Sequence, residues 1–210
     1  MTMIFPMCIT LIAGYIINRE QTDNTLKNIL TVPVSFKQLL TGKLIICGII
    51  SVILGFVCGI FTIIAEFLAG FPKFGATLAI KATLQITFFN FFLYLAVLPI
   101  IALTSRAAKG FLTGVIVAFV YGYGGLFAAG NMTLANLYPV TACLGMIDYR
   151  SYDETVHWNT FLCILSLMIM AGITALIILC MKEQDIELIN KKAKKVLRKD
   201  LFVKCRIILI

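Results

Sequence analysis

Residues 19–43 read R-E-Q-T-D-N-T-L-K-N-I-L-T-V-P-V-S-F-K-Q-L-L-T-G-K, a polar stretch between two hydrophobic runs around which the rest of the chain is organised. Apolar residues recur in it at helical spacing, which predicts short amphipathic helices; they are Leu26, Ile29, Leu30, Leu39 and Leu40. Pro33 cannot continue a helix and pushes Val32 toward an extended conformation, so a break is expected there. The stretch is either a helix lying on a membrane surface or a docking element for a soluble partner.

The composition indicates a membrane protein. The chain has 210 residues, of which 60% are hydrophobic and 13% charged, whereas soluble domains carry about 25% charged residues. We therefore expect an all-α polytopic bundle with no second soluble domain and no nucleic-acid partner. The seven cysteines form no C-x-x-C pair, so neither a zinc site nor a disulfide framework is expected, and the cysteines are interpreted as small core residues.

Five apolar runs are long enough, or nearly so, to cross a bilayer, which takes about 17–25 residues. The predicted spans are about 2–18, 44–66, 82–105, 110–130 and 159–181, within a transmembrane permease domain 1–182 that precedes a basic cytoplasmic tail, 183–210. Pro99 predicts a kink in the third span, and Phe71 to Lys81 is expected to be a short outer connection. Gly55 and Gly59 have the spacing that lets two helices approach closely.

Charge decides the topology of the segment 110–147, which has 38 uncharged positions. This segment is either two spans, or one span followed by an outer amphipathic or re-entrant piece. With one crossing, fifteen Lys and Arg residues lie on the inner side and three, Lys73, Lys81 and Arg150, on the outer side. The positive-inside rule favours that arrangement. It predicts a multi-pass protein of the cell membrane with its N-terminus outside and its C-terminus in the cytoplasm.

The sequence Tyr121-Gly-Tyr-Gly-Gly125 is unusual near the end of a span. It is expected to loosen the helix, either as a frayed helix end or as a flexible gate. The outer segment 131–159 follows it. Candidate residues for an outer gate or substrate site are Tyr121, Tyr123, Tyr138, Asp148 and Arg150. His157 is either a pH sensor or, beside Trp158, an anchor at the membrane interface.

The polar stretch resembles the coupling segment of type-two ATP-binding-cassette exporter permeases. The residues that carry the resemblance are Glu20, Thr25, Leu26, Lys27, Ile29, Leu30, Pro33, Val34 and Lys43, with Asn28 at a variable position of the T-L-K-x-x-L pattern. Phe36 stands where that family has a basic residue, and Lys37 follows it. The small permeases of lantibiotic and bacitracin self-protection are the branch that the chain resembles most. Family members have six spans, and the five predicted here begin where the family's second span begins. Either the start of the chain is truncated or misassigned, or this variant lacks the first helix of the family.

The resemblance implies a permease that exports a hydrophobic or peptide-like compound, such as an antimicrobial peptide or drug. No P-loop is present, because Lys37 stands where the first glycine would be. No Asp, Glu, Lys or Arg lies securely mid-membrane, unlike in ion-coupled carriers. We therefore expect ATP-Mg to bind a separate cytoplasmic nucleotide-binding ATPase subunit. A second permease chain, identical or different, and membrane lipid are the other expected partners.

The sequence leaves two other classes of function to consider. The chain could be a non-transporting membrane immunity or sensor protein that binds a peptide at its outer segment. An intramembrane enzyme is disfavoured, because the spans lack paired carboxylates, a histidine cluster or a Ser/His pair. No catalytic residue and no metal site is expected.

Overall fold

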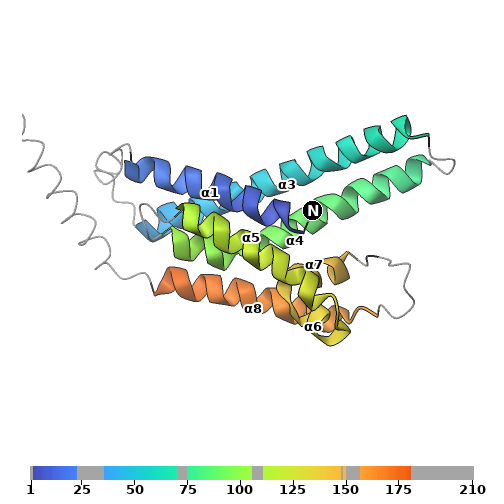
Figure 1. Ribbon diagram of the computed structural model, residues 1–210. Coiled ribbons are helices and arrows are strands. Elements are labelled where there is room, and N and C mark those ends of the chain that lie inside the picture. The colour runs from blue at the N-terminus through green and yellow to red at the C-terminus, as the bar shows by residue number, and fades with distance from the viewer. Residues whose placement is uncertain are drawn as a thin grey trace, which may run out of the picture.

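The computed structural model describes residues 2–22, 36–70, 75–105, 111–147, 149 and 157–180. These residues form helices, without strands in the described ranges (Figure 1). The expected all-α class is therefore confirmed. The helices are α1 (Ile4–Thr22), α3 (Phe36–Leu68), α4 (Ala76–Thr104), α5 (Phe111–Ala128), α6 (Met132–Leu137), α7 (Pro139–Met146) and α8 (Thr160–Leu179).

Helix α4 is the centre of the bundle, because it packs against α1, α3, α5, α7 and α8. In Figure 1, α3 and α4 form a long antiparallel pair that extends beyond α1 and α5. The pair approaches closely where Gly55 and Gly59 lie, since a Cβ atom on Gly59 would be 2.8 Å from the Thr83 side chain. The small-residue spacing in α3 thus marks a real helix contact. The largest fully buried side chains include Ile9, Leu93, Val97, Ile101 and Val140.

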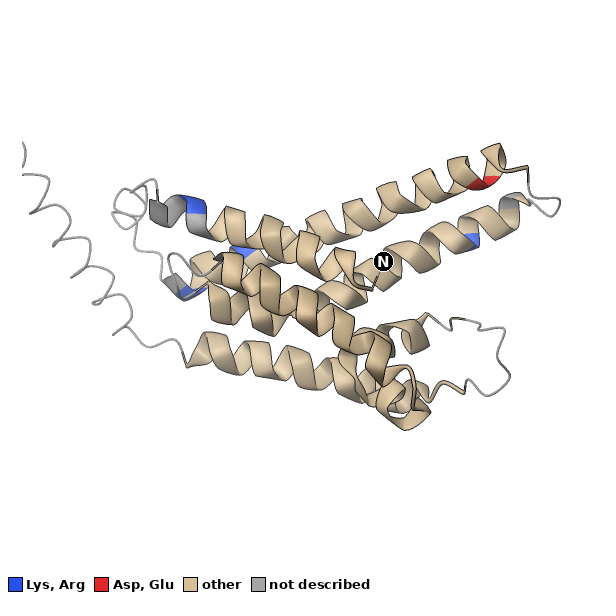
Figure 2. Ribbon diagram, in the orientation of Figure 1, with Lys and Arg blue, Asp and Glu red and all other residues tan. Residues whose placement is uncertain are grey.

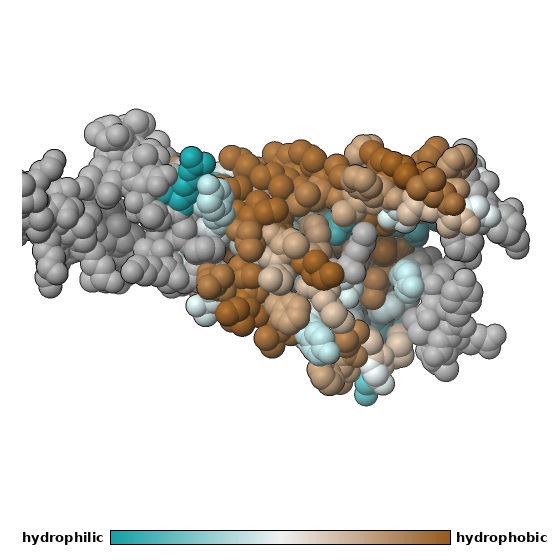
Figure 3. Space-filling view, turned by 45° about the horizontal axis from the view of Figure 1, so that its top comes forward, coloured by the Kyte–Doolittle hydropathy of each residue, from teal (hydrophilic) through white to brown (hydrophobic). Residues whose placement is uncertain are grey.

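Three helical segments are long and apolar enough to cross a membrane: Lys37–Leu68, Thr77–Thr104 and Thr160–Leu179. The apolar segments Ile4–Ile17 and Leu112–Ala128 are shorter, so five crossings remain a prediction. Large hydrophobic side chains cover much of the surface (Figure 3), and Phe127 is 77% exposed. A contiguous apolar surface of this kind suits contact with lipid.

Charged residues in the described part of the chain are confined to the end regions of helices, as Figure 2 shows. Arg19 and Glu20 lie near the end of α1, Lys37 and Lys43 in the first turns of α3, Glu66 near its end, and Lys81 in the second turn of α4. The middle of each described helix is uncharged. This distribution places the apolar length of the bundle between two polar ends, as a bilayer requires.

Two helix boundaries differ from the expected ones. Helix α3 begins at Phe36 rather than near 44, so residues 36–43 at the end of the polar stretch continue directly into the apolar helix. The reason is packing: Leu40 and Leu44 are both buried in the core. Helix α4 begins at Ala76, so the connection expected over Phe71–Lys81 is shorter. Helix α4 continues through Pro99, which is buried.

The uncharged segment after α5 folds into two short helices rather than a second span. Helices α6 and α7 have six and eight residues, or lengths of roughly 9 and 12 Å at 1.5 Å per residue, and the hydrocarbon core is about 30 Å thick. They meet at Tyr138, which is extended, and Pro139 starts α7. Both helices pack against α8. The geometry corresponds to one span followed by a short outer or re-entrant piece.

Candidate functional site

The polar stretch connects the end of α1 to the start of α3, and these ends lie at the same end of the bundle (Figure 1). Of the coupling residues expected from sequence, the structure describes the backbone of Glu20 in α1 and the whole of Lys43 in α3. The others lie outside the described residues: Thr25, Leu26, Lys27, Ile29, Leu30, Pro33 and Val34. The contacts at the two ends of the stretch therefore define this site.

Lys43 points into the bundle, and only 8% of it is exposed. Its Nζ donates to the carbonyl oxygens of Ile16 and Ile17, at 3.1 and 3.4 Å. These carbonyls belong to the C-terminal part of α1, where the helix dipole favours a positive charge. The lysine expected to close the docking surface is thus buried, and it joins α3 to α1. The spacing of apolar residues does not predict these two hydrogen bonds, because both acceptors are backbone carbonyl oxygens of another helix.

Lys37 makes the corresponding contact to the last helix. Its Nζ donates to the carbonyl oxygen of Leu179, at 2.9 Å, across 142 residues of sequence. Leu179 ends α8, so this contact also places a cation at a helix C-terminus. From the sequence, Lys37 was notable only because it lies one residue after the position where the family has a basic residue. Together, Lys37 and Lys43 connect the start of α3 to both α8 and α1.

The next turns of α3 are joined to α4 by buried hydrogen bonds. The Tyr94 hydroxyl donates to the carbonyl oxygen of Leu44 at 2.5 Å, and the Ser51 hydroxyl donates to that of Asn90 at 3.0 Å. Gly48 makes room for the Tyr94 ring, since a Cβ atom there would lie 3.2 Å from it. These contacts therefore connect the start of α3 to α4 as well. The sequence does not distinguish Asn90 from an ordinary span residue.

The three tyrosines proposed for an outer gate have different environments. Tyr121 and Tyr138 pack together with ring centroids 5.3 Å apart, and the Tyr138 hydroxyl donates to the Tyr121 carbonyl oxygen at 2.5 Å. Burial raises the pKa of the Tyr138 phenol above its ordinary value, so the donor stays protonated. Tyr123 instead lies on the exposed face of α5, stacked between Phe119 and Phe127. Asp148 and Arg150 lie outside the described residues.

The glycines between these tyrosines do not loosen the helix, so the expected frayed end is wrong. Helix α5 runs unbroken to Ala128. A Cβ atom on Gly122 would lie 2.9 Å from the carbonyl oxygen of Thr2, and one on Gly124 would lie 2.7 Å from the Tyr138 hydroxyl. The glycines are needed because neighbouring chain segments approach closely. This is a packed junction between α5, the start of α1 and the α6–α7 turn.

Polar contacts hold the segment before α8 against α6. Asn136 is 5% exposed, and its Oδ1 accepts from the backbone N–H of Asn159 at 3.1 Å. The Trp158 indole donates to the carbonyl oxygen of Tyr149 at 2.9 Å, and His157 is exposed beside it. This end of the bundle is an ordered cap. Within the described residues, no group of three or more His, Cys, Asp or Glu side chains is placed to hold a metal ion.

A bundle of long apolar helices with charges confined to its ends defines a polytopic helical membrane protein. The family model described as ABC-2 family transporter protein matches residues 1–125, which is more than half of the chain. The protein therefore belongs to this family and is a membrane permease component of an ATP-binding-cassette transporter. Such a permease works with a separate ATP-binding subunit. Neither the curated proteins nor the solved structures contain a match to the chain.

Proposed function

We propose that the chain is the permease subunit of an exporter for a hydrophobic or peptide-like compound, such as an antimicrobial peptide or drug. In this proposal the cytoplasmic ATPase subunit binds the segment from Glu20 to Lys43. The observation that carries it is the pair of lysine contacts at the start of α3, to Leu179 of α8 and to Ile16 and Ile17 of α1. A force applied to this segment reaches three helices at once.

The mechanism follows from these connections. Closure of the partner on ATP would displace the polar stretch, and Lys43 and Lys37 would carry that displacement to α1 and α8. Tyr94 and Ser51 would carry it from α3 to the central helix α4. The other end of the bundle, where α5 packs on Tyr138, would then open or close a path to the outer leaflet. In this orientation the N-terminus lies outside and the C-terminus in the cytoplasm.

A second permease chain is part of the proposal. The five predicted membrane-spanning helices are few to enclose a path for a peptide-sized substrate. The core of the bundle is also filled by side chains such as Leu93, Val97 and Ile101. A path between two chains, identical or different, avoids that limit. We favour substrates of the lantibiotic and bacitracin class, because the coupling segment resembles that of the small permeases of lantibiotic and bacitracin self-protection.

Charge substitution in the docking helix tests the role of the ATPase. Leu26→Asp and Leu30→Asp each place a charge on the expected apolar contact face, so co-purification of the nucleotide-binding subunit should fall at least ten-fold. Asn28→Asp introduces the same charge at the variable position of the motif and should leave co-purification unchanged. Equal recovery of the ATPase subunit with all three variants would refute docking at this segment.

The ordered outer end favours one alternative, a non-transporting immunity or sensor protein. Asn136 joins α6 to the residue before α8, and Trp158 is hydrogen-bonded to Tyr149, which gives the described part of that end a defined surface for a peptide. Replacing 131–159 by the corresponding segment of a permease with another specificity would then abolish protection against the peptide, and Leu26→Asp would leave it intact. The exporter proposal expects Leu26→Asp to abolish protection as well.

A further inference from the structure

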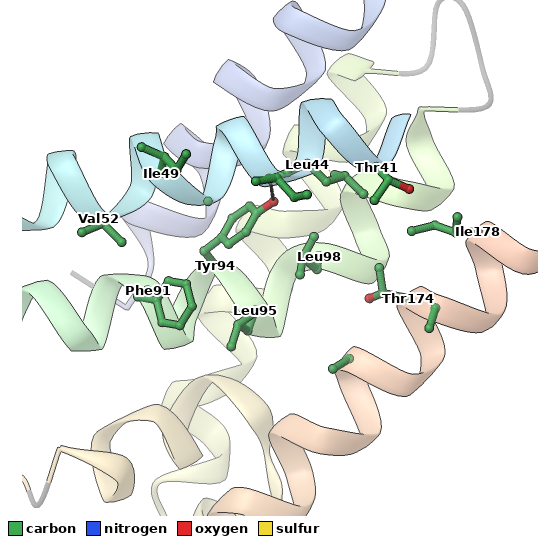
Figure 4. Close-up of a pocket in the computed structure, with 14 residues that line it drawn as sticks. Thr41, Leu44, Ile49, Val52, Phe91, Tyr94, Leu95, Leu98, Thr174 and Ile178 are labelled. Carbon is green, nitrogen blue, oxygen red and sulfur yellow. Dashed lines mark hydrogen bonds between the residues drawn. The ribbon is translucent and has the colours of Figure 1, made fainter. Parts of the chain in front are cut away.

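An open apolar groove lies between α3, α4 and α8 (Figure 4). Its volume is about 490 Å³, which lies in the range of about 300–1,000 Å³ typical of ligand sites. The hydroxyls in its wall already donate to backbone carbonyls: Thr41 to Lys37, Tyr94 to Leu44 and Thr174 to Met170. The wall therefore offers a ligand apolar contact rather than hydrogen bonds.

The groove has a narrow cationic end and a wide apolar end. Figure 4 shows α3 and α8 converging at Thr41 and Ile178 and separating toward Val52. One helical turn before Thr41, the Lys37 ammonium donates to the carbonyl oxygen of Leu179, at 2.9 Å. This contact spans the narrow end and holds a positive charge there. An ammonium has three donors, so it can bind an anion while it holds this carbonyl.

The length of the groove matches one leaflet of a bilayer. From Thr41 to Val52 is eleven residues of α3, or roughly 16 Å at 1.5 Å per residue. Half of a hydrocarbon core about 30 Å thick is about 15 Å. The groove also runs along the helices, as a lipid chain does in a membrane. Its cation lies at the end where the headgroup layer of that leaflet would be.

We propose that this groove binds an anionic phospholipid, with one acyl chain along α3, α4 and α8 and its phosphate at Lys37. Basic residues at the end of a cleft between transmembrane helices are a known basis for recognition of anionic headgroups. The site lies between the helices that the coupling segment is expected to move. A bound lipid would therefore stabilise one spacing of α3 and α8.

Charge disfavours the C-terminal tail as the occupant. Its final residues, Ile207 to Ile210, are apolar, but Arg206 directly precedes them and nine Lys and Arg residues lie from Lys182 onward. Bringing that segment to Lys37 would place like charges together. An anionic headgroup has the opposite sign.

Photolabelling of the full-length protein in vesicles tests the proposal. The probes are phosphatidylglycerol and phosphatidylcholine with a diazirine on one acyl chain, and labelled peptides are mapped by mass spectrometry. Label from phosphatidylglycerol should concentrate on α3, α4 and α8 residues of the groove. Lys37→Gln should lower that label about five-fold, and leave labelling by phosphatidylcholine unchanged.

A groove-filling variant provides the second, independent arm. Ala175 lines the groove on α8, so Ala175→Trp should fill part of the groove and reduce its labelling by both lipids. Leu176 lies on the adjacent exposed face of α8, so Leu176→Trp should leave the labelling of the groove unchanged. Equal labelling of the Ala175 and Leu176 variants would overturn the proposal, and so would loss of phosphatidylcholine labelling in Lys37→Gln. In a further variant, Ile207 to Ile210 are replaced by serine. If the lipids label the groove only in this variant, the tail occupies the groove in the native protein and the lipid proposal is refuted.

Discussion

Several single residues owe their identity to close contacts between helices. Gly145 is the clearest case, because a Cβ atom there would lie 2.5 Å from the Cys163 Sγ and 3.0 Å from the Trp158 ring. Gly172 lies in the middle of α8, and a Cβ atom there would meet nothing within 4 Å. Two glycines in similar apolar sequence therefore have different roles, one required by packing and one not.

We expect Gly145→Ala to destabilise the protein by about 1–3 kcal/mol, because the added methyl overpacks the junction of α7 and α8. Gly172→Ala, the matched control, should leave the melting temperature in detergent unchanged or slightly raised, since alanine is the better helix former. The double variant Gly145→Ala/Cys163→Ala should recover part of the loss, because it removes the clashing sulfur. Equal melting temperatures for the two single glycine variants would contradict the close contact.

At the scale of helices, the start of α3 is the element to which the others are connected. Lys43 reaches α1, Lys37 reaches α8, and Tyr94 of α4 reaches Leu44. The same helix continues without a break from the polar stretch into the membrane segment. A continuous helix that begins in the proposed docking segment can transmit a displacement along its length without an intervening hinge.

We expect Lys43→Met to loosen α1 from α3 at modest cost, about 1 kcal/mol in the free energy of unfolding. The cost is modest because the Ile16 and Ile17 carbonyls remain available to the hydrogen-bond ladder of α1. Hydrogen exchange should accelerate in the amides of Ile17 to Thr22. Lys81→Met removes an exposed lysine at the opposite end of the bundle and should leave that exchange unchanged. Unaltered exchange in the Lys43 variant would show that the contact does not hold α1.

At the scale of the whole molecule, the asymmetry of charge predicts the orientation in the membrane. With one crossing over 110–147, fifteen of the eighteen Lys and Arg residues are expected on the side of the polar stretch and the tail. The short helices α6 and α7 support a single crossing within the segment 110–147, since neither can span the bilayer. An ATPase in the cytoplasm can reach the polar stretch only in this orientation.

Cysteine labelling of intact cells tests the orientation. In a background with the seven native cysteines replaced, Lys73→Cys should react with a membrane-impermeant maleimide in intact cells, because 71–74 is expected outside. Lys27→Cys should react only after the membrane is permeabilised. Reaction of Lys27→Cys in intact cells would place the polar stretch outside and rule out its use as an ATPase docking site.

Much of the helix content was predictable from local pattern. Apolar runs bounded by charges or turns predicted the approximate positions of α1, α3, α4, α5 and α8, since burial in lipid demands uninterrupted apolar helices. The boundaries were less accurate at Phe36 and Ala76, where side chains such as Leu40 pack in the core and extend the helix beyond the apolar run. The regular helix over the tyrosine–glycine segment 121–125 was not predicted, because glycine commonly indicates flexibility, whereas here it permits close packing between chain segments.

The sequence by itself determined that this is a multi-helix membrane protein with a polar stretch between its first two apolar runs, because hydrophobicity and helical period are local properties. Only the tertiary structure decided that Lys43 faces α1, that Lys37 reaches Leu179, and that α3, α4 and α8 leave a groove between them. These features join atoms far apart in the chain, the Lys37 contact across 142 residues. No local pattern records such a distance, because it depends on how whole helices pack.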